Sequence, residues 1–181
     1  MGQYYNAVFL ADKTNAADKE FIRAAIRAFT FNNGMKLVEH SYIHNTFLSA
    51  VEFLLSPLGI FYKTRLVWAG DYADPEPGSK ENLHALCDNK EYMPHLPVDY
   101  CDIMATHNFI VNHTKKQYVT KTGRQFHPLS LLTAEGNGRG GGDYKGSCEN
   151  LIGTWARDVI SVEVVPPADY SELACPFGQE E

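Results

Sequence analysis

The chain has 181 residues, of which 44% are hydrophobic. This is enough apolar material for one globular domain with a core, and it argues against disorder except at the ends. The formal net charge of −6 argues against bulk binding to nucleic acid or to an anionic membrane, because both need a basic surface.

Three kinds of sequence feature that would indicate another cellular location are absent. No apolar run approaches the roughly 20 residues that a membrane-spanning helix needs. Residues 1–5 lack the pattern of a signal peptide. The four cysteines are scattered and form no CxxC motif, which is typical of free thiols in a reducing compartment. We therefore expect a cytoplasmic protein that does not bind membranes.

The first half of the chain is predicted to alternate strands and helices. Aromatic and β-branched residues at 4–10 predict a strand. Apolar residues at helical spacing between 21 and 29 predict a helix that Asn15 would cap. The same rules predict a short strand at 35–39, a helix capped by Asn45, a buried strand at 65–69 and an acidic turn at 70–78.

The second half is predicted to be richer in strands. Residues 77–106 contain several prolines and are interpreted as a connector, with one short helix after Ser79. The expected elements beyond it are a hairpin of strands at 108–111 and 117–121, a strand at 129–133, a strand at 159–165 and a loose tail at 171–181. Together these elements predict a single α+β domain over residues 1–181, with a mainly antiparallel sheet and two or three helices.

The two halves of the chain contain segments of similar sequence, a similarity that we call the internal echo. Without a gap, residues 58–68 align with residues 152–162, so that Gly59 meets Gly153 and Lys63 meets Arg157. The tripeptide Gly-Asp-Tyr also occurs twice, once in each half. We interpret the echo as an internal pseudo-twofold duplication with repeat halves at 1–76 and 107–170. The alternative is chance similarity between short strand–turn–strand patterns.

Six of the 14 glycines lie in the run EGNGRGGGDYKG at residues 135–146. Glycine costs conformational entropy, and we see no packing need for such a run in the sequence. Its bare N–H groups could instead form an anion-binding nest. The run matches GxGxxG, but no helix can follow it, which excludes a dinucleotide-binding βαβ unit.

The glycine run is therefore predicted to hold phosphate or carboxylate. Arg139 and Lys145 would supply the cations, and Tyr144 or Trp155 would stack on a base. The predicted ligand-binding residues are Gly138, Arg139, Gly140, Gly141, Gly142, Asp143, Tyr144, Lys145 and Trp155. A surface loop without a ligand is the alternative.

The remaining polar residues give weaker signals. Asp71, Asp74 and Glu76 could hold a divalent cation, but their setting favours a simple turn, so no metal is expected. If a metal bound, Asp71 and Asp143 would be its first ligands. One of the histidines 107, 113 and 127 could act as a general base, although hydrogen-bonded histidines are commoner. No nucleophile motif is present, and Cys148 is the one thiol close to the glycine run.

Five segments carry a resemblance to a known family: residues 1–5, 35–40, 68–74, 135–143 and 152–155. Together they resemble an uncharacterised family of cytosolic proteins from bacteria and their phages. The resemblance implies a prokaryotic or viral protein, located in the host cytoplasm if it is phage-encoded. It also favours a counter-defence role, and it transfers no catalytic residue.

The sequence thus favours a binding protein for a small anionic ligand, with a nucleotide or a nucleotide-derived signal as the leading candidate. One alternative is an acidic inhibitor of a host protein. A further alternative is a metal-assisted phosphoesterase that uses Asp71 and Asp143. Binding is favoured over catalysis, and no cofactor is expected. The oligomeric state is left open.

Overall fold

The computed structural model describes residues 2–137, 142–174 and 177–178. An eight-stranded, mainly antiparallel sheet forms its centre, with the order β2-β1-β3-β7-β4-β5-β8 and with β6 also paired to β3. The strands are β1 Tyr5–Leu10, β2 Ile22–Arg27, β3 Thr64–Gly70, β4 Phe109–Asn112, β5 Gln117–Thr120, β6 Ala134–Glu135, β7 Val159–Glu163 and β8 Ser171–Glu172. The predicted α+β class is confirmed.

Five α-helices occur in the described residues, more than the two or three expected. They are α1 Leu37–His40, α2 Thr46–Leu55, α3 Leu83–Leu86, α4 Tyr100–Ala105 and α5 Pro128–Thr133, with 3-10 turns η1 Ala28–Phe31, η2 Asp88–Lys90 and η4 Glu149–Leu151. Only α2 reaches ten residues, and none of the helices in the described part of the chain is long and apolar enough to span a membrane.

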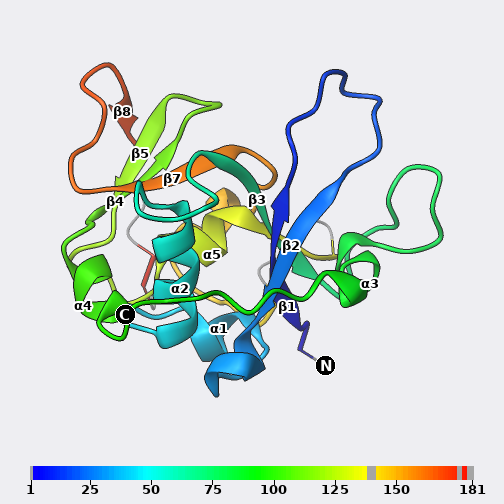
Figure 1. Ribbon diagram of the computed structural model, residues 1–181, viewed down its shortest axis with the longest axis horizontal. Coiled ribbons are helices and arrows are strands. Elements are labelled where there is room, and N and C mark those ends of the chain that lie inside the picture. Colours follow the sequence, from blue (N-terminus) through cyan, green and yellow to red (C-terminus); the bar gives the residue numbers. More distant parts are fainter. Residues whose placement is uncertain (1, 138–141, 175–176, 179–181) are drawn as a thin grey trace.

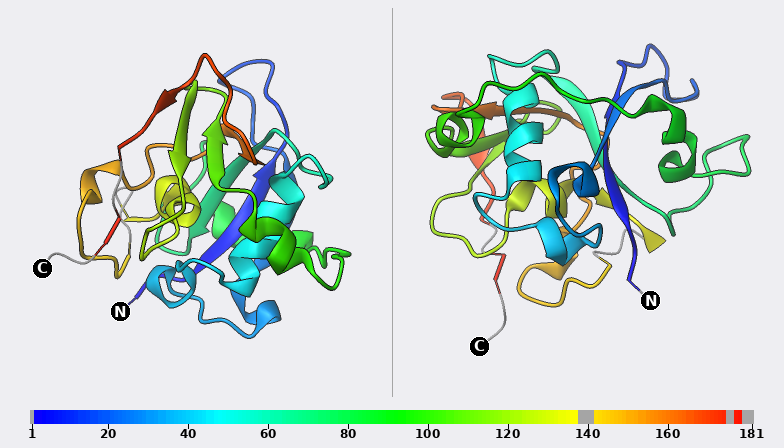
Figure 2. Two further views of the ribbon diagram at one scale, coloured as in Figure 1. Left: turned by 90° about the vertical axis from the view of Figure 1, so that its left-hand side faces the viewer. Right: turned by 60° about the horizontal axis from the view of Figure 1, so that its bottom comes forward.

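The sheet separates two apolar layers of unequal size (Figures 1 and 2). Helices α1, α2 and α5 cover one face, and α3 lies against β1–β3 on the other. Because side chains alternate along a strand, Phe9 of β1 enters the larger layer and Val8 enters the smaller one. Strand β1 is consequently buried along its whole length.

Three predicted elements are wrong. The segment predicted as a helix at 21–29 is β2, which pairs with β1 so that Ala7 lies opposite Ile26. Its apolar residues suit a helix by spacing, but both faces of this strand are buried, so pairing with β1 overrides local propensity. The segments predicted as strands at 35–39 and 129–133 contain the helices α1 and α5.

Other predicted elements agree with the structure. The strands at 4–10, 65–69 and 159–165 and the hairpin of β4 and β5 are confirmed, as is the helix after Asn45. The Asn45 side chain accepts a hydrogen bond from the Leu48 amide at 3.1 Å, as an N-cap should. Within the described part of the tail, β8 pairs with β5 and Phe177 is buried.

The strand order is the one that an internal duplication would produce. The β1–β2 hairpin adjoins β3, and the β4–β5 hairpin adjoins β7. At the join between β3 and β7, Arg65 lies opposite Val159, the residue that the sequence echo makes its equivalent. Lys63 and Arg157, also equivalent, both have a positive φ, of 53° and 68°. These features support the duplication, which stays a prediction.

Candidate functional site

The centre of the predicted glycine site, Gly138, Arg139, Gly140 and Gly141, lies outside the described residues. The flanking glycines have packing reasons that the sequence did not reveal. A Cβ on Gly136 would lie 2.2 Å from Gln3 Oε1, and one on Gly146 would lie 2.3 Å from the carbonyl oxygen of Gly178. Gly142 has a φ of 59°. The expectation that packing needs none of these glycines is therefore corrected.

The two aromatic residues predicted to stack on a base are buried. Tyr144 is 2% exposed and donates a hydrogen bond to the Ser147 carbonyl oxygen at 2.7 Å. Trp155 is 1% exposed, and its Nε1 donates to Gln117 Oε1 at 3.3 Å. Neither ring presents an open face to a ligand, whereas Lys145 is exposed.

The two Gly-Asp-Tyr tripeptides meet around Tyr5. A Cβ on Gly70 or on Gly142 would lie 3.0 or 3.2 Å from opposite edges of the Tyr5 ring. Burial raises the pKa of the Tyr5 phenol, and the nearby carboxylates of Asp143 and Asp71 raise it further. Each aspartate also accepts a backbone hydrogen bond, and within the described part of the chain no group of His, Cys, Asp or Glu has a metal-binding arrangement.

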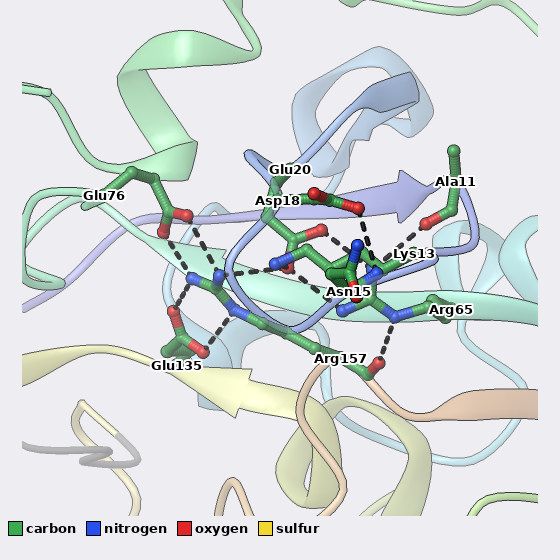
Figure 3. A network of polar contacts seen from close by, with 9 residues as sticks. All are labelled: Ala11, Lys13, Asn15, Asp18, Glu20, Arg65, Glu76, Glu135 and Arg157. Carbon is green, nitrogen blue, oxygen red and sulfur yellow. Dashed lines mark hydrogen bonds and ion pairs between the residues drawn. The ribbon is translucent and has the colours of Figure 1, made fainter. Parts of the chain in front are cut away.

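A network of charged residues crosses the α3 side of the sheet where β3, β6 and β7 meet (Figure 3). Its first part holds Glu20, whose side chain is 3% exposed. Arg65 Nη1 and Nη2 donate to the two Glu20 oxygens at 2.8 and 3.0 Å, and Lys13 Nζ lies 2.9 Å from Oε1. Burial alone would raise the pKa of Glu20, but the hydrogen bonds from Arg65 and Lys13 outweigh it and lower the pKa.

Arg157 forms the second part of the network, between two further carboxylates (Figure 3). Its Nη1 donates to Glu76 Oε2 at 3.0 Å and its Nε donates to Glu135 Oε2 at 3.0 Å. Its Nη2 contacts the second oxygen of each carboxylate, so both pairs are bidentate. Burial would lower the pKa of Arg157, but the hydrogen bonds that it donates to Glu76 and Glu135 raise the pKa instead.

The two parts of the network join at Glu20, because Arg157 Nη1 lies 3.4 Å from Glu20 Oε1. Three carboxylates therefore face three cations, Lys13, Arg65 and Arg157, and the formal charges cancel. The six residues come from the β1–β2 loop, β3, the acidic turn, β6 and the turn before β7. The sequence hinted only at Glu76, in the acidic turn, and at Arg157, in the internal echo.

A cavity of about 390 Å³ opens beside this network, between residues 13–22 and 76–86. Its charged wall includes Lys13, Glu20, Glu76 and Arg157. Its apolar wall includes Ile22, Leu83 and Leu86. The arrangement places cationic donors and an apolar surface around one hollow, which is the composition of a small-molecule site.

His113, a predicted candidate base, belongs to a hydrogen-bond chain that does not place Ser161 as a nucleophile. Ser161 Oγ donates to Glu163 Oε1 at 2.7 Å, so it must accept from His113 Nε2, also at 2.7 Å. A nucleophilic serine would donate to the histidine instead. The His113 Nδ1 then accepts from Tyr170 Oη at 3.0 Å, and burial lowers the pKa of His113, in keeping with a neutral ring.

His127, another candidate base, lies in a buried cluster with Glu52 and Lys121. Its Nδ1 accepts from the Leu129 amide and caps α5, so the ring proton is on Nε2, 3.1 Å from Glu52 Oε1. Lys121 Nζ donates to the same oxygen at 2.6 Å and to the Met104 carbonyl oxygen at 2.8 Å. The cluster thereby connects α2, α4, the start of α5 and the end of β5 inside the core. His107, the remaining candidate, lies against the end of α4.

The comparisons with known proteins add no assignment. No family model matches the chain, and neither a curated protein nor a solved structure matches it.

Proposed function

We propose that this protein binds a small anionic ligand of nucleotide size in the cavity beside Arg157. The observation that carries the proposal is the meeting of a charged wall, centred on Lys13 and Arg157, with an apolar wall in one hollow. Its volume of about 390 Å³ falls within the usual range for ligand pockets. The site thus differs from the glycine run that the sequence favours.

The two walls suit the two parts of such a ligand. Ile22, Leu83 and Leu86 would cover a base or another flat ring, which gains by leaving water. An ammonium group has three N–H donors, and one from Lys13 reaches Glu20, so the same group can also bind a ligand phosphate or carboxylate. The exposed Lys19 and Asp18 also line the cavity, so they add one cation and one carboxylate.

The backbone conformation and the buried charges of the network favour a binding role over a purely structural one. Arg157 has a φ of 68°, a conformation that costs an L-residue about 1 kcal/mol or more and is concentrated at functional sites. Buried ion pairs are also a weak source of stability, because desolvation offsets their attraction. Strain and buried charge together are better explained by a binding site.

A nucleotide or nucleotide-derived signal remains the leading ligand, and a counter-defence role in a phage follows from the family resemblance alone. The glycine run starts at Glu135 of the network, so Arg139 stays a candidate for a second contact with the ligand, whereas Lys145 is expected to make none. The inhibitor and phosphoesterase alternatives gain no comparable support. Glu76 is engaged by Arg157, and Asp71 and Asp143 lie in no metal-binding cluster of the described residues.

A thermal-shift titration with AMP, ADP, ATP and cyclic nucleotides tests the proposal. A ligand that binds the folded state raises Tm with its concentration. We expect such a rise in the wild-type protein, a smaller rise in Lys13→Ala and an unchanged rise in Lys145→Ala, each measured from the variant's own baseline. A flat response to the whole panel, or a loss in Lys145→Ala only, would overturn the proposal.

A further inference from the structure

We propose that Glu76 is an internal stand-in for the anionic group of the ligand: the ligand replaces the Glu76 carboxylate on Arg157, and the acidic turn moves away. This inference rests on the proposed function and says how its site is controlled. The carboxylate of Glu76 already occupies the Nη1 and Nη2 edge of the guanidinium, which is the edge that bidentate anion recognition uses.

The two carboxylates on Arg157 have different positions relative to the cavity. Glu76 and Arg157 both line it, whereas Glu135 is not among its lining residues. Figure 3 shows Glu76 and Glu135 on different sides of the guanidinium, with Glu135 extending from β6. An anion entering the cavity therefore meets Arg157 where Glu76 sits, while Glu135 holds Nε from behind.

Replacement of the Glu76 carboxylate by an anionic ligand would preserve the charge balance around Arg157. Lys13, Arg65 and Arg157 carry three positive charges, and the three glutamates carry three negative ones. Without the Glu76 carboxylate the network would have a net charge of +1 beside a hollow. One anionic group at this place balances the network, and either Glu76 or a ligand can supply it.

The segment that carries Glu76 is built to move as a unit. Its backbone closes on itself, since the Glu76 amide donates to the Glu81 carbonyl oxygen at 2.9 Å and the Ser79 amide donates to that of Glu76 at 2.9 Å. Gly78 at its tip has a φ of 75° and no atom within 4 Å of a Cβ position. By contrast, three cations hold Glu20, because Arg65 and Lys13 bind it in addition to Arg157.

The test compares Glu76→Gln with Glu81→Gln, a matched change in the same segment at an exposed residue outside the cavity lining. The dissociation constants of AMP and inorganic phosphate are measured by calorimetry for both variants and the wild-type protein. Removal of an internal competitor should tighten binding about fivefold or more in Glu76→Gln, the size of a typical coupling between sites. Glu81→Gln should bind as the wild-type protein does.

The outcomes separate the two proposals. Wild-type binding that Glu76→Gln leaves unchanged or weakens would overturn the exchange but keep the ligand site. If AMP and phosphate bind neither the wild-type protein nor Glu76→Gln, both proposals are overturned. Hydrogen exchange of the wild-type protein is a second measure that needs no variant. Saturating AMP should speed exchange at 71–82, and unchanged or slower exchange would contradict the replacement of Glu76.

Discussion

Glu20 binds Arg65 through both carboxylate oxygens, at 2.8 and 3.0 Å, although 45 residues separate them in the chain. The pair fastens the long β1–β2 loop onto the central strand β3, and Lys13 of the same loop adds a second contact to Glu20. One wall of the cavity is therefore held in place before any ligand arrives. A preorganised wall reduces the ordering cost of binding.

Lys121→Met should destabilise the protein strongly. The change leaves the buried Glu52 carboxylate without its cation, and breaking a buried ion pair in this way costs about 3–5 kcal/mol. Glu52→Leu combined with Lys121→Met should recover most of the loss, because no unpaired charge remains. Urea unfolding measures both, with the exposed Lys80→Met as control. A Lys121→Met loss as small as that of the control would refute a stabilising role for the cluster.

The free energy of unfolding should fall as the pH drops from 6.5 towards 4. Trp68 Nε1 donates to His40 Nε2 at 2.9 Å, so His40 Nδ1 carries the proton and donates to the Gly34 carbonyl oxygen. Burial lowers the pKa of His40 to about 4 from its ordinary 6.5. The unfolded chain therefore binds more protons in this window, which removes about 3 kcal/mol of stability at a slope of up to about 1.4 kcal/mol per pH unit.

Urea unfolding of both the wild-type protein and His40→Gln between pH 6.5 and 5 separates this effect from that of His84 and His113, whose pKa values burial also lowers. His40→Gln keeps a hydrogen-bonding side chain at the position but cannot titrate. Its stability should change less with pH than that of the wild-type protein. Equal slopes in the two proteins would show that His40 does not remain neutral in the fold.

Gly59→Ala should cost about 1–3 kcal/mol through overpacking against the end of α2. An added Cβ would lie 2.2 Å from the carbonyl oxygen of Phe53 and 2.3 Å from that of Leu54, and backbone atoms cannot rotate away. Gly123→Ala is a suitable comparison, since Gly123 has a φ of 76° but open space around it. Thermal unfolding should rank Gly59→Ala below Gly123→Ala, and the reverse order would contradict the close approach.

Tryptophan fluorescence should be insensitive to the ligand. Trp68 is 0% exposed and Trp155 is 1% exposed, and neither lines the cavity. We therefore expect blue-shifted emission, weak quenching by iodide and no change when AMP is added. A strong shift or quench on addition of AMP would favour stacking on Trp155, as the sequence alone suggests.

The sequence predicted the elements whose signals are local. Asn45 marks the start of α2, and the alternation of β-branched residues marks β7. It misassigned β2, because Ile22 and Ile26, buried on opposite faces of the sheet, have the four-residue spacing of a helix face. That distinction depends on the partner strand, which only the tertiary structure supplies.

The charged site was beyond the reach of local patterns for a similar reason. Arg157 meets Glu135 22 residues away and Glu76 81 residues away, and no spacing rule connects such positions. The glycine run gave the stronger local signal, although close packing explains why Gly136 and Gly146 are glycines. The internal echo was the useful signal, since it singled out Arg157 as the equivalent of Lys63, and both have a positive φ.

An NMR titration of the ¹⁵N-labelled protein with AMP is the sharpest test of ligand binding beside Arg157, because it locates the ligand residue by residue. We expect amide shifts at residues 13–22 and 76–86, around the cavity beside Arg157. Shifts confined to residues 136–146, or no shifts at all at millimolar AMP, would contradict this expectation.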